Sequence, residues 1–161
     1  MAYSVRIVAN ALLIRANDKK IKLSHMKLQK LVFFMHAWSL ALNDTPLLKE
    51  KPVAWPHGLV FDTLYRDLKC HGSDAIHSLL TELNPATGNI AAMIPNPKDK
   101  TFWSLLDSVW NRYSGFSAMQ LSALTHEPGG PWDMARQEKS GEITDESVKT
   151  YYKKKLNAVA P

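Results

Sequence analysis

Apolar residues recur at intervals of three and four positions through most of the chain, which is the period of one face of an α-helix. A first apolar stripe runs from Val5 to Ala16, and a wider one runs from Leu28 to Leu42. Ser24 stands just before the second stripe, where its hydroxyl can accept a hydrogen bond from an unpaired backbone N–H at a helix start. We therefore predict two consecutive helices, the second being the more deeply buried.

The same spacing predicts six further helical segments. We expect them at about 60–70, from Asp74 to about 83, at 99–114, at 117–125, at 131–139 and after Thr144. Ser117 and Gln120 have the spacing of a capping box, in which a hydroxyl and an amide satisfy backbone groups at the helix start. Asp99 is expected to cap the helix that follows it.

Two stretches lack the helical period. Residues 46–59 contain three prolines and one glycine, and residues 84–100 contain three more prolines. Because proline removes a backbone donor and fixes φ, we expect extended chain around residues 50–56, with a short strand at Val53 and Ala54. A loop or small β-excursion is expected around 88–98. The predicted fold is mainly α, with residues 1–161 forming a single compact helical domain that has one or two short extended segments.

Composition limits the class of protein. The chain has 161 residues, of which 45% are hydrophobic and 22% charged, values typical of a globular domain. Its single cysteine, Cys70, excludes an internal disulfide and fits a reducing compartment. We find no signal peptide and no apolar run near the roughly 20 residues of a membrane span. We therefore expect a cytoplasmic protein with no membrane partner.

The net charge is +5, from 20 lysines and arginines against 15 acidic residues. This balance permits either nucleic acid or an acidic protein as a partner. The short segment 117–125 carries Gln120 but no cation, which argues against a DNA-recognition helix there. The pairs and runs at 19–20 and 153–155 are typical of solvated helix faces.

No strong catalytic or metal-binding motif is present. The six histidines form no H-E-x-x-H arrangement, and the chain has no C-x-x-C, G-x-S-x-G or P-loop motif. We therefore predict no enzyme activity, no metal site and no cofactor. A hydrolase built from His57, His126 and Glu127 would require the two turns that carry these residues to meet in space.

Those two turns, "AWPHG" and "LTHEPGGPW", have an alternative structural role. Each contains a tryptophan whose N–H needs a partner when buried, together with prolines and glycines that shape a chain reversal. Thr125 and His126 can bond to nearby carbonyl groups. The residues predicted to brace the turns are Trp55, Pro56, Gly58, Thr125, His126, Pro131 and Trp132.

Lys27, Gln29 and Lys30 lie in the predicted first turns of the second helix. Lysines there oppose the positive end of the helix dipole, which costs a little stability. Two interpretations stay open: a solvated first turn, or a contact with an acidic partner.

Taken in order, "MKLQKLVFFMHAW", "AWPHGLVFDTLYRDLKCHG" and "VWNRYSGFSAMQLSALTHEPGGPW" resemble the Panacea domain, the SocA-like or GepA-like antitoxin family of bacteria and phages. The resemblance extends from about residue 5 to 155. The matching positions are Lys27, Leu28, Gln29, Lys30, Leu31, Trp55, Pro56, Gly58, Leu64, Tyr65, Leu121, Leu124, Thr125, His126, Pro131 and Trp132. Leu59 departs from the family, which usually has proline there.

The resemblance implies an antitoxin that neutralises a cognate toxin by direct protein–protein binding. The alternatives are a proteolytic adaptor for the toxin and a nucleic-acid-binding regulator of phage or prophage origin. A homo-oligomer is compatible with either role. The residues that we expect to contact the partner are Lys27, Gln29, Lys30, His57 and Glu127.

Overall fold

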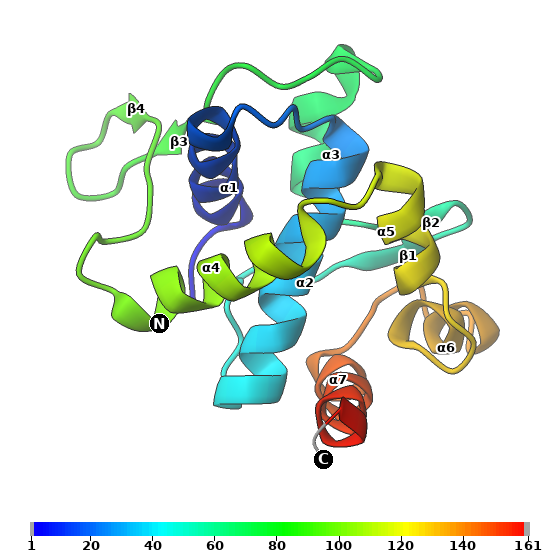
Figure 1. The fold of residues 1–161 in the computed structure, drawn as a ribbon. Helices are drawn as coiled ribbons and strands as arrows, with labels where there is room; N and C mark the ends of the chain where they lie inside the picture. The colour runs from blue at the N-terminus through cyan, green and yellow to red at the C-terminus, as the bar shows by residue number, and fades with distance from the viewer. Residues whose placement is uncertain (1, 160–161) are drawn as a thin grey trace.

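The fold is organised around one long helix. The structure is a computed structural model that describes residues 2–159. Helix α2 (His25–Asn43) lies in the middle of the molecule, and Figure 1 shows the other helices arranged around it. It contacts α1 (Val5–Lys19), α3 (Asp62–Leu68), α4 (Lys100–Tyr113), α5 (Ala118–Thr125) and α7 (Asp145–Val159). Every residue of α2 from 28 to 41 is buried, which confirms the prediction that the second helix is the more deeply buried.

The helix starts predicted at Ser24, Asp99 and Ser117 are confirmed. Ser24 accepts a hydrogen bond from the Lys27 N–H at 3.3 Å, and Asp99 accepts one from Phe102 N–H at 3.0 Å. Both bonds of the capping box form at the start of α5. Helix α6 (Pro131–Gln137) begins with proline, whose missing N–H costs nothing in the first turn. These starts are set by local sequence and needed no knowledge of the rest of the fold.

The residues described contain two short antiparallel hairpins. Strand β1 (Val53–Trp55) pairs with β2 (Gly58–Val60), so the predicted strand at 53–54 is confirmed. Its partner strand was not predicted, and the helix expected from residue 60 begins at Asp62 instead. In the second hairpin, β3 (Glu82–Leu83) pairs with β4 (Ile90–Ala91). Strand β4 lies in the region expected to hold a β-excursion, whereas β3 lies in the segment expected to be helical.

The predicted helix from Asp74 to about 83 is wrong. A short 3₁₀ turn, η1 (Lys69–His71), ends the preceding helix, and the chain then runs irregularly to β3. The buried Asn10 side chain explains this conformation. Its amide N–H donates to Leu80 O at 2.9 Å, and its oxygen accepts from Leu80 N–H at 2.7 Å. These bonds from α1 occupy backbone groups that a helix would use internally.

Aromatic rings fill the core between α2, α4 and α7. The Phe34 and Tyr113 rings stack with centroids 4.0 Å apart, and the Trp38 indole N–H donates to the Tyr113 hydroxyl at 2.8 Å. Tyr152 packs edge-on against Trp38. Within residues 2–159, no helix is both long enough and apolar enough to span a bilayer.

Candidate partner-binding site

The two turns singled out from the sequence meet in the structure. The β1–β2 turn and the α5–α6 turn form what we call the two-turn corner, residues 55–58 and 125–132. The Trp132 indole N–H donates to the Trp55 carbonyl at 2.8 Å. The His126 ring packs on the Trp132 ring with centroids 4.3 Å apart. One hydrogen bond and one ring contact therefore join segments that are far apart in sequence.

Gly58 lies at the closest point of this corner. Its φ is 135°, a conformation that L side chains rarely adopt. A Cβ added here would lie 2.9 Å from His126 Nε2 and 3.0 Å from Lys30 Nζ. Only glycine allows the hairpin to approach these two side chains so closely.

Lys30 of the central helix binds the backbone of the hairpin. Its side chain projects from α2, is 3% exposed, and its ammonium group donates to Leu59 O at 2.9 Å. Burial lowers the pKa of Lys30 to about 8, because the charged form loses its hydration. The carbonyl of Leu59 is thus held in place by a side chain of the central helix.

Gln29 holds the backbone of Phe61, the residue that follows strand β2. Its amide nitrogen donates to Phe61 O at 3.2 Å, and its amide oxygen accepts from Phe61 N–H at 2.9 Å. Gln29 is 2% exposed. We considered that these residues form a solvated first turn. That interpretation does not hold for Gln29 or Lys30, because both side chains are buried and bonded to the backbone at the hairpin.

The His126 side chain is half-buried. Its Nε2 is buried and has no hydrogen-bond partner among the described residues. Burial lowers the pKa of His126, and the nearby Lys30 charge lowers it further. A neutral imidazole beside the ammonium group is the form that this arrangement favours.

Glu127 connects the corner to the last helix. Its carboxylate accepts a short hydrogen bond from the Tyr151 hydroxyl and pairs with Lys155 Nζ at 2.8 Å. The hydrogen bond with Lys155, followed by that with Tyr151, holds the pKa of Glu127 below its usual value. A Cβ on Gly130 would lie 3.0 Å from Glu127 O and 3.5 Å from the Tyr151 ring, so this contact is also close.

The remaining residues predicted to contact the partner or to brace the turns differ in exposure. Pro56 and His57 are exposed at the tip of the hairpin, whereas Pro131 is buried at the start of α6. Thr125 is 4% exposed and donates to Ser122 O at 2.8 Å. Lys27 is half-buried and donates to Ser114 O at 2.6 Å, so it ties α2 to the chain before α5.

Sequence reasoning missed three supports of the corner. Tyr65 of α3 packs edge-on against Trp55 with ring centroids 4.7 Å apart. Arg136 donates to Ala54 O at 3.4 Å. The Tyr151 hydroxyl donates to the Glu127 carboxylate, which joins elements that no local pattern connects.

The geometry also bears on catalysis. The two turns meet, which was the condition set for a hydrolase. However, no hydrogen bond joins His57, His126 and Glu127 to one another among the described residues, and the Glu127 carboxylate is engaged by Tyr151 and Lys155. In the same part of the chain, no three His, Cys, Asp or Glu side chains are placed to hold a metal ion.

The fold and the corner define a mainly helical protein in which polar side chains of the central helix hold a β-hairpin against a helix–helix turn. The chain belongs to the family described as antitoxin SocA-like, Panacea domain, which matches residues 28–133. It is similar to Antitoxin SocA of Caulobacter vibrioides (strain NA1000 / CB15N), with 32% identity over 129 residues, 80% of this chain and 68% of that protein. No solved structure matches the chain. The resemblance drawn from the sequence motifs is thereby confirmed.

Proposed function

We propose that this protein is the antitoxin of a toxin–antitoxin pair, and that it neutralises its toxin by binding the toxin protein directly in the cytoplasm. Membership of the SocA-like family and the similarity to Antitoxin SocA support this role. We further propose that residues 1–161 act as a single domain. The toxin is then the protein's required partner, and no cofactor takes part.

The two-turn corner is the surface that we propose for the toxin. The observation that carries this assignment is the contrast between its exposed tip and its buried supports. Pro56 and His57 project into solvent. The backbone just after this tip is fixed by the buried polar groups of Gln29 and Lys30. A turn fixed in this way loses little conformational entropy on binding, which favours affinity.

Within this surface we assign two kinds of role. His57 and the half-exposed Glu127 and Lys27 are proposed to contact the toxin directly. Gln29 and Lys30 are proposed to act through the hairpin that they hold. We therefore keep all five residues expected from the sequence to bind the partner. The exposed ones are proposed to contact the toxin, and the buried ones are proposed to support the hairpin.

Co-expression tests the proposal. The product of the neighbouring gene is expressed with this protein, and growth rescue and affinity are measured together. His57→Ala and Glu127→Ala should weaken binding about tenfold each if they lie at the centre of the contact. His71→Ala and Glu138→Ala, outside the corner, are the matched controls. A neighbouring gene that is harmless alone, with a product that does not bind, contradicts the proposed function.

The same purified pair separates neutralisation by occlusion from delivery to a protease. If the antitoxin inhibits the toxin in a protease-free assay, binding alone suffices. Inhibition that requires added protease would favour the adaptor. Salt-dependent retardation of duplex DNA by the protein alone would instead support a nucleic-acid regulator.

A hydrolase is the second candidate, because the turns that carry His57 and His126 do meet. His126→Ala distinguishes the two functions. As a catalytic base, His126 could be removed with loss of activity and unchanged stability. As a structural residue packed on Trp132, its removal should lower the melting temperature.

A further inference from the structure

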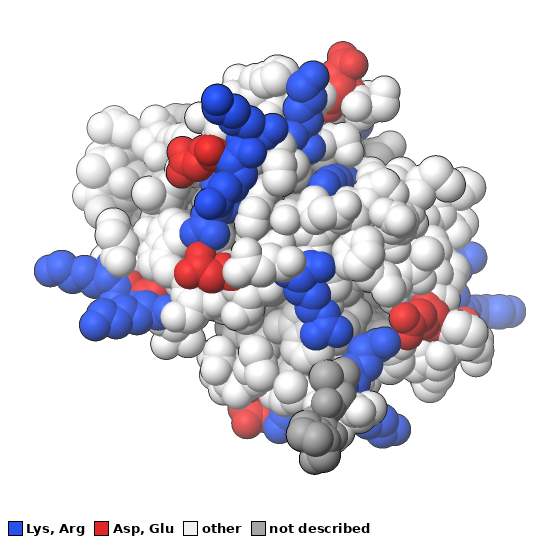
Figure 2. Space-filling model, in the orientation of Figure 1, with Lys and Arg blue, Asp and Glu red and all other residues white. Residues whose placement is uncertain are grey.

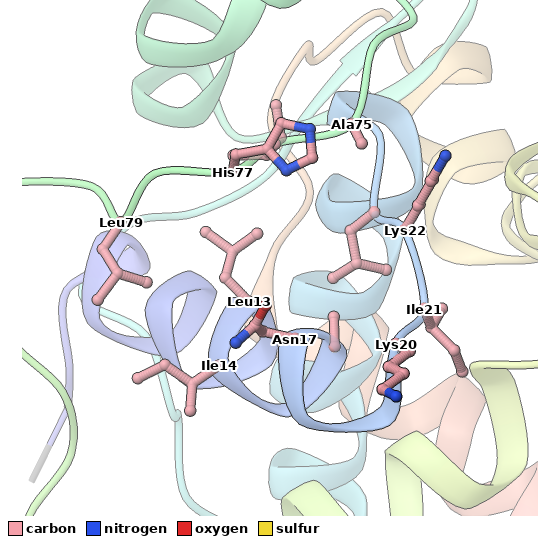
Figure 3. Close-up of a pocket in the computed structure, with 12 residues that line it drawn as sticks. Leu13, Ile14, Asn17, Lys20, Ile21, Lys22, Ala75, His77 and Leu79 are labelled. Carbon is pink, nitrogen blue, oxygen red and sulfur yellow. The ribbon is translucent and has the colours of Figure 1, made fainter.

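A second surface of the molecule has the features of a peptide-binding cleft. A cavity of about 520 Å³ lies between the C-terminal half of α1 and residues 75–79. Figure 3 shows its lining side chains, with Ile14 and Leu79 on one side and Ile21 and Lys22 on the other. The cleft is formed by elements that take no part in the two-turn corner.

The walls of the cleft are apolar in part and polar in part. Leu13, Ile14, Ile21 and Leu79 line it, and Leu79 remains 37% exposed. An exposed leucine beside a concave apolar surface is a place where a partner side chain can displace water. The cleft can therefore accept at least one apolar side chain.

The charged residues that line the cleft are all cationic. Lys20 and Lys22 line it, and no aspartate or glutamate does. Neither lysine forms an ion pair with a described residue. Figure 2 shows a band of lysine and arginine side chains on the face over α1. An occupant that carries carboxylates would complement this charge.

The backbone along one edge of the cleft offers free hydrogen-bonding groups. Ile76 N–H donates to Leu23 O at 2.8 Å, and Leu80 N–H donates to the Asn10 side chain at 2.7 Å. Between these anchors, residues 77–79 are exposed, and their N–H and C=O groups bond to no other described residue. Exposed backbone groups beside a cleft can bond to the backbone of an extended peptide, here without a strand at residues 77–79 themselves.

We propose that this cleft binds an extended, acidic segment of a protein partner. The segment's backbone pairs with residues 77–79, a leucine-like side chain inserts between Ile14 and Leu79, and its carboxylates lie near Lys20 and Lys22. This binding site is separate from the corner proposed to contact the toxin. It gives the antitoxin a second docking surface whose occupant is defined by its chemistry.

A designed peptide tests the proposal. The probe is a fluorescein-labelled eight-residue peptide in which leucine alternates with glutamate, and fluorescence polarisation measures its binding to the intact protein. We expect saturable binding that weakens as salt increases. The same peptide with lysine in place of glutamate should not bind, and a version N-methylated on its leucine amides should bind more weakly, because it cannot donate to the cleft backbone.

Protein variants then locate the binding. Lys20→Glu with Lys22→Glu should weaken it about tenfold, since two exposed charge contacts are reversed. Lys98→Glu with Lys100→Glu, at exposed positions elsewhere, is the matched charge control. Glu127→Ala at the corner should leave peptide binding unchanged, so failure here is distinct from failure of toxin binding.

Four outcomes would overturn the proposal. Three of them are the absence of saturable binding, equal affinity for the lysine peptide, and insensitivity to the Lys20 and Lys22 reversals. Displacement of the peptide by millimolar inorganic phosphate would also overturn it, because the site would then recognise a small anion. The lysine variants keep the test valid, as both side chains lie at the rim and support no described bond of the core.

Discussion

The Trp132 indole N–H donates to the backbone carbonyl of Trp55 at 2.8 Å, across 77 positions of sequence. This bond joins α6 to the β1–β2 hairpin. Lys30 and Gln29 of α2 bond to the backbone at Leu59 and Phe61. The hairpin is therefore held by both α6 and α2, which is why its exposed tip can serve as a rigid contact.

Trp132→Phe should destabilise the protein by about 1–2 kcal/mol, because the part-buried Trp55 carbonyl loses its donor while most of the ring packing remains. Urea denaturation followed by circular dichroism measures the change. Trp103→Phe is the control, since Trp103 donates its N–H to Asn96 O at 2.9 Å in an exposed bond that water can replace. Equal losses in both variants would show that the Trp132 bond has no special role.

Gly58→Ala should cost about 2–4 kcal/mol, because it adds backbone strain to a clash with two buried polar atoms. The new Cβ would meet His126 Nε2 at 2.9 Å at a φ of 135°. Gly115→Ala is the matched control, because a Cβ there meets nothing within 4 Å and its φ is unexceptional. A Gly58 variant as stable as the Gly115 variant would contradict the close approach.

Features that depend on local sequence could be predicted, as Ser117 and Gln120 illustrate. Their capping box closes over three residues, so the sequence alone contains both partners. The same holds for Asp99 at the start of α4 and for the strand at Val53.

Features that depend on distant partners could not be predicted. The segment after Asp74 has a helix-like pattern, but Asn10 bonds to Leu80 across 70 positions and holds it in another conformation. Gln29 and Lys30 look like solvent-facing residues of a first turn, because the hairpin that buries them lies about thirty positions further on. Motif residues could thus be identified from the sequence, while their burial required the fold.

Stability should decrease as the pH falls from about 7 to about 5, because several histidines are neutral in the fold. Burial is the largest cause of the lowered pKa of His25, His36 and His126. His36 uses both ring nitrogens, accepting from Leu48 N–H at 3.3 Å and bonding to Asp145 at 2.9 Å. The unfolded chain takes up these protons near pH 6.5, the ordinary pKa of histidine, so the stabilisation is complete above that pH and is lost below it.

Each such histidine can contribute a slope of at most about 1.4 kcal/mol per pH unit to the unfolding free energy. His36→Gln should reduce the slope measured by urea denaturation at a series of pH values. His77→Gln, at an exposed position, is the control and should leave the slope as it is. A pH-independent stability over this range would contradict the neutral, buried state of these rings.

Tyr151→Phe should destabilise the protein by about 1 kcal/mol or more, because the hydroxyl donates to a charged carboxylate in a part-buried position. Glu127→Gln should cost a similar amount, because an amide oxygen accepts a weaker bond than a carboxylate does. The double variant should cost less than the sum, since each single change already weakens or removes the same bond. Chemical denaturation of the four proteins measures the coupling between α7 and the two-turn corner.

Lys155→Met separates the two partners of Glu127. The Lys155 pair is exposed in part, with side-chain exposures of 34% and 35%, so its loss should cost only about 0.5 kcal/mol. If the Tyr151 and Glu127 changes are additive while Lys155→Met is costly, the ion pair rather than the hydroxyl holds α7 against the corner. Strong coupling between the Tyr151 and Glu127 changes, with a small loss of stability in Lys155→Met, would instead mean that Tyr151 sets the position of Glu127. Variants at Tyr151 should then weaken toxin binding although Tyr151 itself does not contact the toxin.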